Sequence, residues 1–107
     1  MLFRSQRINR AIELAGPLPT LLDTRAVVYT RMGRSDDAIP ELEKILAETK
    51  AGSAGFHLCQ ALLASKRWSA ARSAYERLRS SPFQPDQLDP LERPMWEQFE
   101  KEMRSRW

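Results

Sequence analysis

Apolar residues between positions 21 and 46 follow two helical stripes separated by a glycine. In the first stripe Leu22, Ala26 and Tyr29 recur at intervals of four and three residues, the spacing of one face of an amphipathic helix. The second stripe contains Ala38, Ile39, Leu42, Ile45 and Leu46. Gly33 lies between them and can adopt the left-handed conformation that ends a helix. We therefore predict two antiparallel helices that pack through these stripes.

Apolar stripes also predict helices on both sides of this central pair. The expected helices span residues 3–15, 55–65 and 68–79, and a last one runs from Leu91 or Pro94 to Arg104. Prolines at positions 82, 85 and 90 interrupt the helical pattern before this last helix. Its expected apolar face is Leu91, Met95, Phe99 and Met103. Together these segments predict an all-α fold of about six helices.

The pattern repeats along the chain with a period of 33 or 34 residues. A shift of the central pair by 33 residues places small residues on small ones and large apolar residues on large ones: Ala26 on Cys59, Tyr29 on Leu62, Ala38 on Ala71, Leu42 on Tyr75 and Ile45 on Leu78. A shift back by 34 residues places Leu42 on Ile8, Ile45 on Ala11 and Leu46 on Ile12. A period of this length with two helices per unit is typical of helical repeat proteins.

The central unit resembles the tetratricopeptide repeat. The family's order of large, small, aromatic, turn and closing apolar positions is matched by Leu22, Ala26, Tyr29, Gly33, Ala38, Leu42 and Ile45. The resemblance implies a right-handed α-solenoid of antiparallel helix pairs with a C-terminal capping helix. Within a single domain it implies a partial repeat at 1–16, repeats at 18–51 and 52–84, and the capping helix at 90–106. The second repeat departs from the pattern at Gly55, where a large residue is usual, and at Lys66, which replaces the turn glycine. We expect a differently shaped turn there.

In this family the first helix of each unit lines a concave groove that holds an extended peptide or a partner helix. The resemblance therefore implies a non-catalytic adaptor that binds a protein or peptide. The matching positions in this chain are Asp23, Val27, Thr30, Arg31, Phe56, Gln60 and Leu63. The apolar members of this set either form a binding patch or are buried by neighbouring helices or by the C-terminal segment. Family members that bind the acidic tails of chaperones use Lys and Asn where this chain has Asp23 and Val27, so we do not expect that specificity.

Composition and charge narrow the partner and the compartment. One domain of 107 residues with a net charge of +3 fits a helical protein whose acids and bases alternate on a solvated surface. Cys59 is the only cysteine, so no intrachain disulfide can form and a reducing compartment is expected. No apolar run is long enough to cross a bilayer, and the N-terminal segment lacks the apolar core of a secretory signal. We predict a cytoplasmic protein with no membrane partner.

The sequence carries no recognisable catalytic or metal-binding motif. His57 and Cys59 stand two residues apart on one predicted helix, so their side chains point to different sides and cannot share a proton. We expect Cys59 in the core and His57 on the helix surface. One histidine and one cysteine are too few for a metal site, and no glycine-rich phosphate loop is present. We therefore predict neither catalysis nor a cofactor.

Two further possibilities concern the N-terminal helix and the arginines. The helix at 3–15 matches only the second half of a repeat, so we expect its unpaired face to mediate self-association through residues 1–15. The alternative to a protein-binding module is a small basic helical nucleic-acid-binding domain. Its phosphate contacts would be Arg4, Arg7, Arg10, Arg72, Arg77 and Arg79. No single helix is uniformly basic, and such a domain does not explain the repeat, so a protein partner is favoured.

Overall fold

Six α-helices make up the computed structural model, which describes the backbone of residues 2–106 and the side chains of residues 6–106. The helices are α1 (Leu2–Ala15), α2 (Pro19–Arg31), α3 (Ser35–Thr49), α4 (Gly52–Ala64), α5 (Trp68–Ser80) and α6 (Arg93–Arg106). A short 3-10 helix, η1 (Pro85–Gln87), lies between α5 and α6. The described residues contain no strand, so the predicted all-α fold is confirmed.

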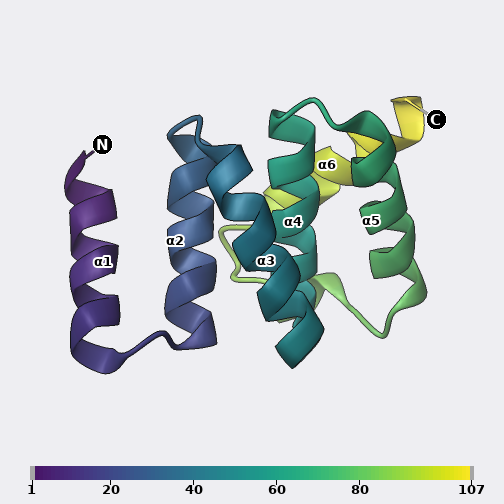
Figure 1. Ribbon diagram of the computed structural model, residues 1–107. Helices are drawn as coiled ribbons and strands as arrows, with labels where there is room; N and C mark the ends of the chain where they lie inside the picture. The colour runs from purple at the N-terminus through teal and green to yellow at the C-terminus, as the bar shows by residue number, and fades with distance from the viewer. Residues whose placement is uncertain (1, 107) are drawn as a thin grey trace.

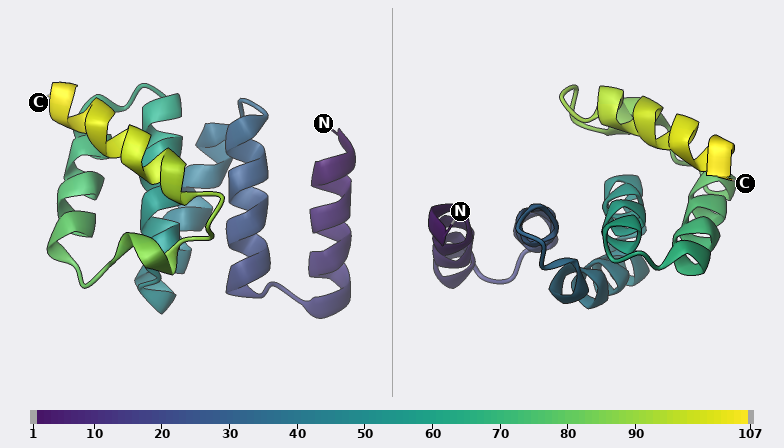
Figure 2. Two further views of the ribbon diagram at one scale, coloured as in Figure 1. Left: turned by 180° about the vertical axis from the view of Figure 1, so that it is seen from behind. Right: turned by 90° about the horizontal axis from the view of Figure 1, so that it is seen from above.

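The first five helices stand side by side in a row, and each packs against the next (Figure 1). The N-terminus lies at one end of this row and the C-terminus at the other. Residues 81–106, which we call the C-terminal segment, turn back from α5 toward α2 before α6 begins (Figure 2). α6 then crosses α4 and α5 as a second layer, on the side of α4 away from α3 (Figure 2). The C-terminal segment therefore covers one side of the row.

The hairpins α2–α3 and α4–α5 close with the same turn. Gly33 has a φ of +81°, and the Arg34 N–H donates to the Tyr29 carbonyl at 2.7 Å. In the second hairpin Lys66 has a φ of +60°, and the next backbone N–H donates to the Leu62 carbonyl at 2.9 Å. The expectation of a different turn at Lys66 is therefore wrong, because this lysine adopts the left-handed conformation that glycine provides in the first hairpin.

Small side chains lie where the helices of the row approach one another. The fully buried small residues include Ala26, Ala38, Cys59 and Ala71, the pairs that the repeat aligns. Small residues let neighbouring helices come close, so that the larger side chains around them interdigitate. Gly55 serves the same purpose, because a Cβ at this position would lie 2.9 Å from the Leu78 Cδ1. The large residue that the repeat pattern places at this position does not fit.

α4 is buried along a continuous stretch, Ala54–Cys59, because helices cover it on several sides. The Phe56 ring is its central contact and lies edge-on to Trp96 at 5.3 Å and to Phe99 at 5.5 Å. The Tyr75 ring of α5 meets Phe99 at 5.5 Å in the same geometry. Aromatic pairs arranged in this way contribute about 0.5–1.5 kcal/mol beyond the area that they bury. These rings attach α6 to α4 and α5.

The buried face of α6 differs from the predicted one. It consists of Trp96, Phe99 and Met103. Leu91 is 84% exposed and Met95 is 37% exposed, so the expected four-residue stripe is wrong. The reason is that α6 begins after Leu91 and packs through residues spaced by three and four. Phe83 extends the contact, since its ring lies 5.1 Å from Trp96 and a Cβ at Gly52 would lie only 2.2 Å from it.

Arg25 of α2 links three helices of the row. Its guanidinium donates to the Asn9 Oδ1 of α1 at 3.1 Å and forms an ion pair with Glu41 of α3. Among the described side chains of α1, Ile8 alone is buried. The N-terminal helix is therefore held to the row by few contacts, and this polar link is one of them.

The left-handed lysine predicts a stabilising substitution. A residue other than glycine in this conformation costs about 1 kcal/mol, so Lys66→Gly should raise the free energy of unfolding by up to about that amount. Urea unfolding followed by circular dichroism measures the change. Ala47→Gly, at an exposed position within α3, is the control and should lower the free energy by about 1 kcal/mol. A Lys66→Gly chain less stable than the wild type would contradict the turn assignment.

Candidate functional site

Three of the predicted groove residues line a hollow beside α2. Asp23, Val27 and Arg31 follow one another at four-residue intervals, so they lie in one row on the same side of the helix. The hollow lies between α2, α4 and the turn before α6, and it has a volume of about 250 Å³. Its lining residues are Asp23, Thr24, Val27, Arg31, His57, Asp89, Leu91 and Glu92. We call it the His57 hollow.

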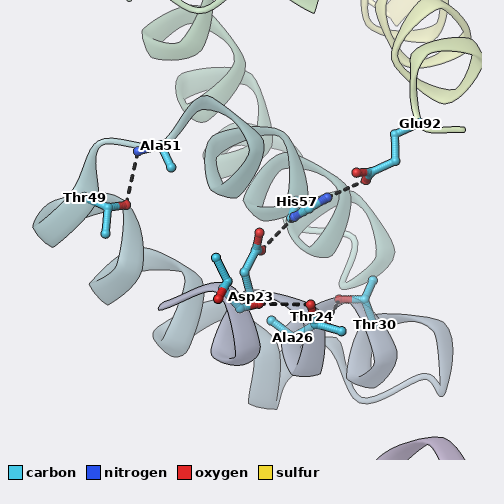
Figure 3. A network of polar contacts seen from close by, with 9 residues as sticks. Asp23, Thr24, Ala26, Thr30, Thr49, Ala51, His57 and Glu92 are labelled. Atoms are coloured by element: carbon cyan, nitrogen blue, oxygen red, sulfur yellow. Dashed lines mark hydrogen bonds and ion pairs between the residues drawn. The ribbon is translucent and has the colours of Figure 1, made fainter. Parts of the chain in front are cut away.

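The turn before α6 forms the wall opposite α2. The Leu91 N–H donates to the Asp89 Oδ1 at 2.9 Å, which fixes the turn. The Trp96 N–H donates to the Glu92 carbonyl at 2.9 Å and so begins the first turn of α6. Leu91 is left largely exposed at the mouth of the hollow, whereas the Glu92 carboxylate points inward (Figure 3).

His57 lies between two carboxylates that come from distant parts of the chain (Figure 3). Its Nδ1 lies 2.7 Å from the Asp23 Oδ1, and its Nε2 lies 2.5 Å from the Glu92 Oε2. The imidazole is buried, and both carboxylates are largely buried beside it. The three side chains therefore connect α2, α4 and the C-terminal segment at one point.

The expectation that His57 lies on the helix surface is wrong. The C-terminal segment covers this side of α4, and no local pattern indicates that a residue beyond three prolines returns to it. The contact with Asp23 was accessible in principle, because the repeat aligns Asp23 with Phe56, the neighbour of His57. The contact with Glu92 had no signal of this kind.

The two contacts of His57 favour the protonated ring. A neutral imidazole carries one N–H and can donate to only one carboxylate, whereas the imidazolium donates to both. Burial by itself lowers the pKa of His57, but hydrogen bonds and negative charges from Asp23 and Glu92 together outweigh it and raise the pKa above its ordinary value. Asp89 and Arg31 are the other charged groups of the hollow. Within the described residues, α3 and α5 supply no charge that acts on the ring.

The remaining predicted groove residues do not line the hollow. The Thr30 hydroxyl donates to the Ala26 carbonyl at 2.9 Å, and Gln60 is half-buried on α4. Phe56 is completely buried under α6, and Leu63 is partly buried against the core. Of the two interpretations of the apolar groove residues, burial is therefore confirmed for Phe56. Val27 instead faces the hollow.

The hollow offers groups that bind rather than a recognisable nucleophile. Cys59 is a buried free thiol, as predicted, and burial raises its pKa to about 12 against a weaker opposing effect of the Arg77 charge. The Thr24 hydroxyl donates to the Thr20 carbonyl at 2.9 Å. Among the described residues no group of three or more His, Cys, Asp or Glu is placed to hold a metal ion. Carboxylates, a guanidinium and two apolar side chains remain for contact with a ligand.

Within residues 2–106 no helix combines the length and apolar character needed to cross a membrane. Comparison with known proteins gives no match: no protein-family model fits the chain, and no match is found among curated proteins or solved structures. Function therefore has to be inferred from the hollow and from the sequence resemblance.

The raised pKa of His57 predicts a pH-dependent contribution to stability. Because the folded chain binds this proton more tightly, the contribution is fully present below the unfolded pKa, about 6.5, and is lost as pH rises through the folded pKa. Urea unfolding of the wild type and of a His57→Gln variant, from about pH 5.5 to about pH 9, measures it. The difference in free energy of unfolding should be largest at the acidic end. A difference that stays constant or grows with pH would contradict the bridged imidazolium.

Proposed function

We propose that this chain is a non-catalytic protein-interaction module of the tetratricopeptide-repeat type, which binds a peptide or partner helix at the His57 hollow. The observation that carries the proposal is the row of Asp23, Val27 and Arg31 on α2, which faces an exposed apolar residue, Leu91, across an open hollow. Apolar side chains combined with a few charged groups in a concave site are typical of binding sites.

The two hairpins support the repeat part of the proposal. They share one turn geometry, and the small residues that the repeat aligns are buried in both. We propose that they are successive units, 18–51 and 52–84, of a right-handed solenoid that starts with a partial unit at 1–16. α6 covers the aromatic side of α4 and α5, which is what a capping helix does in such arrays.

The charges favour a protein partner over nucleic acid. Several arginines form ion pairs: Arg10 with Glu13, Arg34 with Asp37, Arg67 with Asp36, Arg72 with Glu76 and Arg104 with Glu100. The Arg79 guanidinium lies over the Tyr75 ring at 5.6 Å. The side chain of Arg4 lies outside the described residues. Pairing with carboxylates neutralises the positive charge that phosphates would contact.

We also propose that α1 mediates self-association. Its described side chains bury Ile8 against the row and leave Leu14 73% exposed. Sedimentation equilibrium over a range of concentrations should show a dimer at the high end, and Leu14→Glu should shift the chain toward the monomer. A wild type that stays monomeric at high concentration would contradict this part of the proposal.

Selection from a library of random displayed peptides tests the binding site. Peptides selected on the wild type should bind it in fluorescence anisotropy, and Leu91→Glu should weaken them about tenfold because it places a charge on an apolar wall. Gln98→Glu adds the same charge at an exposed position of α6 and should leave binding unchanged. Failure to select any peptide, or an equal loss in both variants, would contradict the site.

A further inference from the structure

The α2 wall of the His57 hollow is ordered by charge. Asp23, Val27 and Arg31 are each about one helical turn apart, so an acid, an apolar side chain and a base follow one another at intervals of about 6 Å. Glu92 stands opposite Asp23, since the two carboxylates flank the same imidazole. The acidic end of the hollow is therefore built from both walls.

Opposite charges mark the two ends of the hollow. At one end Asp23 and Glu92 carry two negative charges against the single positive charge of protonated His57. The other end lies about 12 Å away along α2. There Arg31 is exposed and has no ion-pair or hydrogen-bond partner in the described part of the chain. A ligand that lies along α2 meets a negative region first and a free guanidinium last.

An extended peptide matches this spacing. Alternate residues of an extended chain point to the same side at intervals of about 6.6 Å, so three of them span about 13 Å. This length is close to the distance of about 12 Å between the two charged ends. A partner helix fits less well, because a helix about 10 Å wide and 12 Å long occupies about 900 Å³. The hollow has about 250 Å³, which suits three side chains of an extended segment.

We propose that the His57 hollow binds an extended peptide segment whose alternate residues are basic, apolar and acidic. The basic residue lies at the Asp23 end, and the acidic residue pairs with Arg31. The apolar residue packs between Val27 and Leu91 and loses its contact with water, which supplies the favourable free energy. The two charges select the order and register of the segment. This inference rests on the proposed function, because it names the partner of the same hollow.

A biased display library tests the charge order. It presents the core X-Thr-Leu-Thr-X between glycine–serine flanks, where X is Lys, Arg, Asp, Glu or Gln and threonine favours the extended form. Selection on the wild type should enrich cores with one basic and one acidic end about fivefold over cores whose ends have the same sign. An Arg31→Glu chain makes both ends of the hollow negative, so it should prefer cores with two basic ends.

Lys44→Glu, at an exposed position of α3, changes the net charge equally and should keep the wild-type preference. A switch seen in Arg31→Glu alone supports the proposal. The absence of any charge preference, or the same preference in Arg31→Glu as in the wild type, overturns it. If peptides from the random library still bind in a Leu91-dependent manner, the proposed function stands without the charge order. If neither library yields a binder, both fail.

Discussion

The packing of α6 on Phe56 determines which surface of this chain a ligand can reach. Phe56, Trp96 and Phe99 meet edge to face and are almost completely shielded from water. Burying a large apolar side chain contributes about 1.5–3 kcal/mol, so this cluster is a major part of the stability of a chain of this size. It closes the side of α4 and α5 and leaves the side of α2 open. The open part of the predicted groove is consequently the row that begins at Asp23.

Apolar packing has little directional preference, so a second interaction positions the turn before α6. The contacts of His57 with Asp23 and Glu92 do this, because hydrogen bonds between charged groups have defined lengths and directions. A buried charge is costly unless it is paired, and here two carboxylates compensate one imidazolium. The same contacts hold Glu92 inward and leave Leu91 outward. The shape and the charge of the hollow therefore have one origin.

The sequence predicted what depends on local pattern. Apolar spacing located six helices, and the shift that aligns Ala26 with Cys59 identified positions that are fully buried in both hairpins. Asp23, Val27 and Arg31 were found because one helical row leaves them outside the packing stripe. These features follow from periodicity, which neighbouring residues determine.

The parts that were missed depend on how the C-terminal segment returns to α4. The helical stripe through Leu91 was wrong because the start of α6 is set by the turn at Asp89, where the carboxylate accepts a backbone N–H. Phe56 and His57 resembled exposed positions because nothing near them in sequence covers them. Contacts across 35 residues and several prolines arise from tertiary packing, and one sequence carries no periodic signal for them.

His57 is the only histidine of the chain, so the imidazole signals in ¹⁵N NMR can be assigned without ambiguity. We predict a titration midpoint above the ordinary value of about 6.5, with both ring nitrogens protonated and hydrogen-bonded below that midpoint. Glu92→Gln should lower the midpoint, because it removes one of the two carboxylates. A midpoint at or below the ordinary value, unchanged in Glu92→Gln, would contradict the bridge and the position of the C-terminal segment.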